Sequence, residues 1–255
     1  MTDPTPINFE IESRIVDEVA VLDLDRTLLN SSMVTQLVLA GLAAHGVSAG
    51  RIDKTIRYVE AQTGNSFYLF DYIENKFSSD MLEAVVADIM QNDVMLEEIK
   101  EDLLCPGADK LIYALEEQGT PSMILTYGEE NYQGFKAALF RKLIGKTSDD
   151  LPVVVTNVAN KSEWVENAWF TEGDEFGNIP TDIFDQPIRT RVVAIVDDKK
   201  SNLISYDDRV MGILVDNRVN APTRVTSTAE VASAVASGVH LADIAHLYDD
   251  IDKAS

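Results

Sequence analysis

Two aspartates at the end of an apolar run are the residues best suited to chemistry in this sequence. Asp23 and Asp25 follow the run Val19–Leu22 and precede Thr27. Side chains at positions i and i+2 of a strand point to the same side, so both carboxylates can converge just beyond the strand end. Such a pair suits phosphate transfer, because one acid can attack phosphorus while the other handles the proton. The alternative reading is a strand exit rich in aspartate, a residue common in turns.

Polar or charged groups also follow three later apolar runs. This repetition matters because a short motif is informative only in the right structural context. A chance scatter of acids would rarely place all of these groups at strand ends. The groups are Thr126 after residues 122–125, Lys161 shortly after residues 152–155, and Asp197 with Asp198 after residues 192–196.

The order of these groups resembles the four motifs of the haloacid dehalogenase-like (HAD) hydrolases. Those motifs are Asp-x-Asp-x-Thr, a strand-terminal Ser or Thr, a Lys, and a strand-terminal acidic pair. The resemblance covers most of the chain outside residues 30–104, and its first and fourth motifs are the specific ones. It implies a phosphatase-type hydrolase with a Rossmann-like core and a helical cap.

Beyond residue 105, strand-like and helix-like patterns alternate. This alternation predicts an α/β fold, with a Rossmann-like, mainly parallel sheet and helices on both of its faces. Ligands of such open sheets bind beyond the carboxyl ends of the strands, where all four motifs fall. The predicted strands are 122–126, 152–156, 192–197 and 212–215, and the predicted helices are 108–118, 129–144 and 200–208.

The segment between Leu28 and Cys105 has helical periodicity instead. Apolar residues recur there at spacings of three and four, and serines stand at several of the expected helix starts. The predicted organisation is therefore a catalytic core of residues 1–29 and 105–255. An all-helical cap of residues 30–104 is inserted after the first core strand, where many HAD hydrolases carry one.

The resemblance also implies a role for each residue. Asp23 becomes the nucleophile that forms an aspartyl-phosphate, and Asp25 protonates the leaving oxygen before activating water. Thr126 and Lys161 hold the phosphoryl oxygens. Attack of one anion on another needs compensating charge, and Mg²⁺ prefers oxygen ligands. The implied metal ligands are Asp23, the main-chain carbonyl of Asp25, Asp197 and Asp198.

Each of these residues also has a plainer reading. The aspartates can stabilise turns or cap helices, Thr126 can satisfy backbone at a strand end, and most lysines are solvated. Lys136 and Lys146 are the alternatives to Lys161 as the lysine of the third motif. Arg26 occupies a position often held by Gly in this family, and its side chain can project towards the substrate or towards solvent.

The function predicted on this basis is magnesium-dependent hydrolysis of a small phosphorylated metabolite. Asp25 favours this reading, because the dehalogenase branch of the family lacks an acid at that position. Phosphonate hydrolysis and phosphoryl transfer between sugars are variants that fold alone cannot separate. A binding protein that has kept the scaffold without the activity is the alternative from another class.

The composition and charge of the chain limit the classes of partner that it can bind. The 255-residue chain carries a net charge of −22, which argues against nucleic acid and against anionic membrane surfaces, since both attract Lys and Arg. A single cysteine, Cys105, suits a reducing compartment. The polar N-terminus does not resemble a signal peptide, and no apolar run is long enough to span a bilayer. These features predict a cytoplasmic protein.

Overall fold

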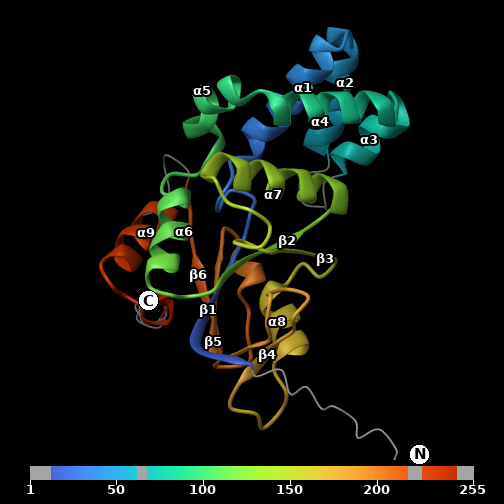
Figure 1. The fold of residues 1–255 in the computed structure, drawn as a ribbon. Coiled ribbons are helices and arrows are strands. Elements are labelled where there is room, and N and C mark those ends of the chain that lie inside the picture. Colours follow the sequence, from blue (N-terminus) through green and yellow to red (C-terminus); the bar gives the residue numbers. More distant parts are fainter. Residues whose placement is uncertain (1–12, 62–67, 218–225, 246–255) are drawn as a thin grey trace, which may run out of the picture.

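A mixed six-stranded sheet forms the centre of the molecule (Figure 1). The structure is a computed structural model, and it describes residues 13–61, 68–217 and 226–245. The strand order is β3-β2-β1-β5-β4, with β6 also paired to β5. All pairings are parallel except that of β4 with β5, so the predicted α/β sheet is confirmed. The strands are β1 (Arg14–Leu22), β2 (Ser122–Tyr127), β3 (Val153–Thr156), β4 (Gly177–Ile179), β5 (Ile188–Asp197) and β6 (Val210–Leu214).

The central strands are apolar on both faces because both faces are covered. Ala20 and Leu22 of β1 belong to the larger hydrophobic cluster, whereas Val19 and Val21 belong to the smaller one on the other face. Both pairs of residues are fully buried. The larger cluster also takes in α6 (Ala108–Glu117), α7 (Glu130–Ile144) and α9 (Thr228–Ala236), and the smaller one takes in α8 (Lys161–Trp169).

A helical insert, residues Ser31–Leu103, separates β1 from α6 and lies beyond the end of the sheet, above α7 (Figure 1). Its two ends leave the core side by side, because the Asn30 N–H donates to Leu103 O at 2.9 Å. Its apolar side chains continue the larger hydrophobic cluster without a break. Its helices are α1 (Ser31–Ala44), α2 (Ala49–Ala61), α3 (Leu69–Lys76), α4 (Ser79–Gln91) and α5 (Asp93–Leu103).

The prediction of a helix over residues 200–208 is wrong. Only the short 3-10 helix η1 (Lys200–Asn202) forms there. The backbone N–H groups of Tyr206 and Asp207 donate to the Glu166 carboxylate of α8 at 2.7 and 3.2 Å. A side-chain acceptor from another element thus takes the N–H groups that a helix would have used.

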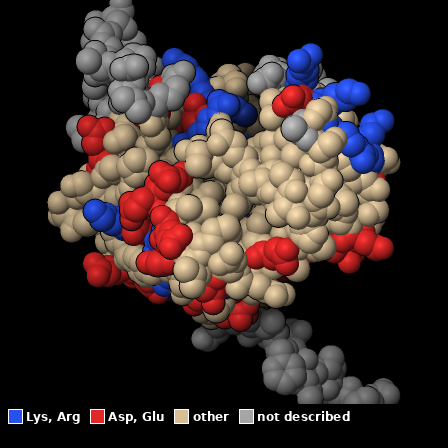
Figure 2. All heavy atoms as spheres, turned by 90° about the horizontal axis from the view of Figure 1, so that it is seen from above, with Lys and Arg blue, Asp and Glu red and all other residues tan. Residues whose placement is uncertain are grey.

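Charge is unevenly spread over the surface. Seen from above, Figure 2 shows most acidic side chains on the left and lower parts of this face and most basic side chains along its upper and upper-right edge. No helix in the parts of the chain that the structure describes is both long and apolar enough to cross a membrane.

Candidate active site

The residues predicted to do chemistry come together at the carboxyl edge of the sheet. Asp23 follows β1, Thr126 is the last residue but one of β2, and Asp197 ends β5. The Asp23 N–H donates to Val196 O at 2.8 Å, which holds the first motif beside the fourth. Lys161 begins α8, one loop after β3, and reaches the same point. Parallel pairing alone brings these strand ends to one edge.

A buried lysine joins two of the acids. Lys161 Nζ donates to Asp23 Oδ1 and lies 2.7 Å from Asp197 Oδ2. All three side chains are almost completely buried. Asp23 also accepts a hydrogen bond at 3.1 Å from the hydroxyl of Thr27, the last residue of the first motif. A single cation therefore faces two buried carboxylates, and the centre is short of positive charge.

Three carboxylates form a cluster that suits a hard cation. Asp23, Asp197 and Asp198 each offer one oxygen, and these oxygens lie within 4.8 Å of one another. Oxygen-only donor sets of this kind fit Mg²⁺. Asp197 is oriented by Asn202, whose amide donates to both carboxylate oxygens at 3.1 Å, and by the Lys199 N–H at 2.8 Å. Such supporting bonds are typical of ligands that must hold one orientation.

Asp25 has a lysine of its own. Lys136, on α7, donates to both carboxylate oxygens, at 2.5 and 2.7 Å, and its side chain is buried. Ser31, at the start of the helical insert, donates to Oδ1 at 2.5 Å, and Gln133 donates to Oδ2 at 3.1 Å. Asp25 is thus held by two elements that do not belong to its own strand.

The two catalytic candidates differ in protonation for a physical reason. Burial raises the pKa of Asp23 to about 7, and the neighbouring acids add to this rise while Lys161 opposes it. Burial acts the same way on Asp25, but the charge and hydrogen bonds of Lys136 outweigh it and lower the pKa of Asp25 to about 2. Burial and Asp197 raise the pKa of Asp198 to about 6. A divalent cation among these acids would favour the ionised form of Asp23.

Thr126 is buried and close to this network. Its hydroxyl donates to Gln133 Oε1 at 3.0 Å, while the Gln133 amide donates to Asp25 and, at 3.0 Å, to Tyr127 O. Gln133 therefore links the second motif to the second acid. A phosphoryl oxygen that binds Thr126 would have to compete with this amide for the hydroxyl.

Helix α7 connects the site to the helical insert. Glu129, just before α7, accepts hydrogen bonds from the N–H groups of Phe70 and Asp71 in α3, at 3.1 and 2.8 Å. Tyr132 Oη lies 3.1 Å from the Thr35 hydroxyl of α1. The helix that carries the partners of Asp25 is thus bonded to two helices of the insert.

Sequence reasoning missed Gln133 and Ser31, and it kept Lys136 only as an alternative to Lys161. Both lysines lie in the site, one on each aspartate of the first motif. Lys146 lies elsewhere and pairs with Glu116 at 2.6 Å. Gln133 and Lys136 are three residues apart in the helix after the second motif, and helical spacing of this kind was the one available signal.

Arg26 stands between the two acids and Thr27 with an unusual backbone. Its φ is +64°, and no other non-glycine residue of the described part of the chain has a positive φ. A side chain in this region costs roughly 1–2 kcal/mol relative to the right-handed conformation. The Arg26 side chain is largely exposed and lies 4.0 Å from Asp198.

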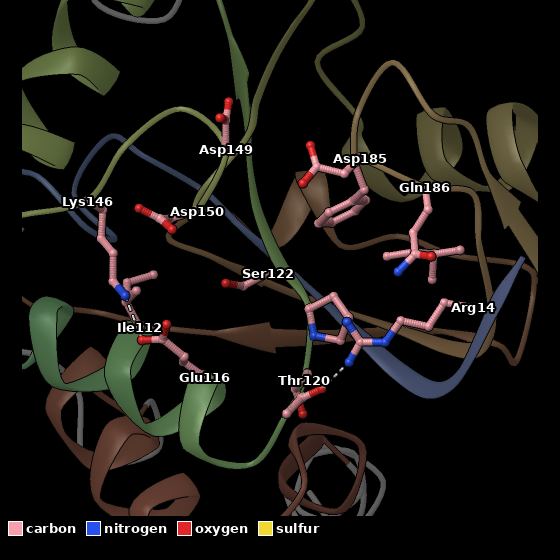
Figure 3. A pocket seen from close by; sticks show the side chains of 14 residues that line it. Arg14, Ile112, Glu116, Thr120, Ser122, Lys146, Asp149, Asp150, Asp185 and Gln186 are labelled. Carbon is pink, nitrogen blue, oxygen red and sulfur yellow. Dashed lines mark hydrogen bonds and ion pairs between the residues drawn. The ribbon is translucent and has the colours of Figure 1, made fainter.

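A hollow of about 320 Å³ lies at the other end of the sheet (Figure 3). Arg14 and Ser122, at the starts of β1 and β2, line it. Its Lys146 is bonded to Glu116, and Arg14 donates to Gly119 O at 3.3 Å. Of the residues considered for the site, only Lys146, an alternative for the third-motif lysine, lines this hollow, so the hollow is separate from the candidate site.

Comparison with solved structures finds similar folds at low sequence identity. A Burkholderia xenovorans protein, assigned to the haloacid dehalogenase-like hydrolases, has a TM-score of 0.47 at 16% identity, over 85% of this chain and 95% of its own. The HAD phosphatase of Thermococcus onnurineus has 0.45 at 13%, over 86% and 97%. CbbY of Rhodobacter sphaeroides, in complex with phosphate, has 0.45 at 14%, over 85% and 96%.

The first two of these structures are described as a haloacid dehalogenase-like hydrolase and a HAD phosphatase, and the third contains phosphate. No family model matches the sequence, and no curated protein matches it either. The functional conclusion therefore rests on the residues of the site itself.

Proposed function

We propose that this protein is a HAD-like phosphatase that hydrolyses the phosphate monoester of a small metabolite with the help of Mg²⁺. One observation carries the proposal. Asp23 and Asp25, two residues apart at a strand end, each have a separate buried lysine, and Asp23 forms a carboxylate cluster with Asp197 and Asp198. A binding site for phosphate alone would not need four acids beside the anion.

Asp23 is the nucleophile of this proposal. One carboxylate oxygen attacks phosphorus and the bond to the ester oxygen breaks, which leaves the phosphoryl group on Asp23. Water then attacks the same phosphorus, the bond to Asp23 breaks, and inorganic phosphate departs. Lys161 stays beside Asp23 and offsets negative charge at the reacting centre, while Thr126 donates to a phosphoryl oxygen.

Asp25 moves the proton in both half-reactions. It gives a proton to the departing ester oxygen and takes one from the attacking water, so it is restored at the end. Asp25 is ionised in the arrangement described, because Lys136 lowers its pKa to about 2. A phosphate dianion beside it raises that pKa, since like charges favour the protonated form. Asp25 therefore takes up one proton from solvent when the substrate binds, and it releases that proton again when phosphate leaves.

Asp23, Asp197 and Asp198 would hold the metal ion, with the main-chain carbonyl of Asp25 as a further ligand by family resemblance. The ion would supply the positive charge that two anions need in order to meet. Asn202 keeps Asp197 in the orientation that such a ligand requires.

The helical insert is proposed to act as the cap. It lies over the carboxyl edge of the sheet, and its Ser31 bonds to Asp25. A cover of this kind suits a small molecule that can be enclosed and shielded from water. The net charge of −22 and the buried free Cys105 support a cytoplasmic protein whose partners are neither nucleic acid nor membrane.

The direct test is hydrolysis of a generic aryl phosphate by purified protein, with and without Mg²⁺. We expect metal-dependent release of phosphate that falls at least a thousandfold in Asp23→Asn, because the variant cannot form the aspartyl-phosphate intermediate. Asp208→Asn, at an exposed acid away from the cluster, is the matched control and should keep full activity. Equal rates for Asp23→Asn and the original protein would refute the proposal. A folded protein inactive on a broad panel of phosphate esters would favour the binding alternative.

A further inference from the structure

The backbone of Arg26 is held by hydrogen bonds that do not involve its side chain. Its N–H donates to Leu29 O at 2.7 Å, and its carbonyl accepts from the Asn217 amide at 2.8 Å. Asn217 in turn bonds to Thr228 at the start of α9. These bonds impose a positive φ on the residue at this position. Glycine meets this demand without strain, so an arginine here needs a reason that lies in its side chain.

The guanidinium stands at the outer side of the acidic cluster. Nη1 lies 4.0 Å from Asp198 Oδ2, and the side chain of Arg26 is 68% exposed against 14% for Asp198. Lys161 and Lys136 are 1% and 3% exposed and are bonded to Asp23 and Asp25. Lys199, which follows Asp198, is exposed like Arg26, but it lies on an extended backbone with φ −121°.

Its contact with Asp198 is weak enough to be exchanged. An exposed pair at the limit of ion-pair distance contributes little, and it does not use the planar fork of the guanidinium. A carboxylate or phosphate can accept two parallel hydrogen bonds from that fork, which makes a stronger interaction. A ligand whose phosphate lies at Asp23 would extend past Asp198 to reach this position.

We infer that Arg26 binds a second anionic group of the substrate, a carboxylate or another phosphate, outside the reacting phosphate. This inference rests on the proposed phosphatase function and narrows its substrate class to doubly anionic phosphate esters. Arg26 then determines specificity, while Lys161 and Lys136 serve the reaction centre. The strained backbone conformation is retained because it carries the guanidinium into the path of the substrate.

A plainer role would be to neutralise Asp198. The two roles differ in what they predict, because a neutralising cation acts on every substrate alike. A cation that binds a second anion acts only on substrates that possess one. Comparison of two substrates of similar size therefore separates them.

The test compares propyl phosphate with 2-carboxyethyl phosphate, which adds a carboxylate. The original protein should have at least tenfold higher kcat/KM on the carboxylated ester, mainly through a lower KM. Arg26→Gln should reduce that preference to within about twofold, and Arg26→Lys should restore part of it. Arg191→Gln, at an exposed arginine on β5 paired with Glu175, should retain both the rates and the preference. A preference that is the same in Arg26→Gln and the original protein would overturn the inference.

Binding gives a readout that does not depend on turnover. In the Asp23→Asn background, calorimetry should show at least tenfold tighter binding of 2-carboxyethyl phosphate than of propyl phosphate. The added Arg26→Gln change should abolish this difference. If the difference is present while the original protein hydrolyses no ester, the proposed function fails, and Arg26 binds the second anion of a ligand that is not hydrolysed. If esters are hydrolysed and Arg26→Gln leaves the difference intact, the inference alone fails.

Discussion

Lys161 Nζ lies 2.7 Å from Asp197 Oδ2, and both side chains are buried. The same ammonium group bonds to Asp23, so one cation ties the end of β1 to the end of β5. Burial lowers the pKa of Lys161, but the two aspartates more than compensate and raise it. Lys161 is therefore charged at neutral pH, and we expect both the stability and the activity of the protein to depend on it.

Replacement of this lysine should be severe. Lys161→Met leaves two buried carboxylates without a cation, and loss of one partner of a buried pair costs about 3–5 kcal/mol. Urea unfolding would measure that loss. Phosphate ester hydrolysis should fall at least a hundredfold, as is typical when a stabilising donor is removed. Lys146→Met is the control, because its pair with Glu116 is partly exposed and worth at most about 1 kcal/mol. Equal losses for the two variants would contradict this view.

Loss of Lys136 should impair the function of Asp25, the carboxylate that it binds. Lys136→Met removes the cation that holds both oxygens of Asp25, so we expect kcat to fall at least tenfold. The free energy of unfolding should fall by about 1.5–3 kcal/mol, the usual worth of hydrogen bonds to charged groups. Lys142→Met tests the same helix on its exposed side, where Lys142 pairs with Asp93. A Lys136→Met protein as active and as stable as Lys142→Met would show that Asp25 needs no such support.

Magnesium should stabilise the folded protein. A ligand that binds only the folded state adds about 2.7 kcal/mol to the free energy of unfolding when its concentration is a hundred times its Kd. The temperature of thermal unfolding should therefore rise as Mg²⁺ is added. Asp198→Asn removes one negative charge from the cluster and should reduce that shift, whereas Asp208→Asn should not. If Mg²⁺ raised the unfolding temperature of Asp198→Asn as much as that of the original protein, the ion would bind elsewhere.

Glu129 should make stability depend on pH. Burial raises its pKa from 4.5 to about 7, despite the hydrogen bonds from Asp71 and Phe70. Between these values the folded protein binds more protons at Glu129 than the unfolded chain does. The stabilisation is therefore complete below about pH 4.5 and is lost as pH rises through 7.

The contribution of one carboxyl is at most about 1.4 kcal/mol per pH unit. Urea unfolding between pH 5 and pH 8 should show that the original protein loses more stability over this range than Glu129→Gln does. The glutamine keeps an acceptor for one N–H of α3 but cannot ionise. Parallel stability curves for the two proteins would show that Glu129 does not titrate in this range.

The sequence by itself determined the sheet and the residues at its edge. Continuous apolar runs such as Val192–Val196 can only be buried between two layers, and parallel strands place their carboxyl ends at one edge. For that reason Asp23, Thr126 and Asp197 could be located without coordinates. The helical character of residues 31–103 was likewise readable, because its periodicity is local.

Only the tertiary structure decided which cation serves which acid. Lys136 and Gln133 are more than a hundred residues from Asp25, and their contact depends on how α7 packs beneath the insert. The positive φ of Arg26 is likewise imposed by Leu29 and by the distant Asn217. Local patterns do not encode such contacts, because they arise from the packing of elements that the chain brings together only after folding.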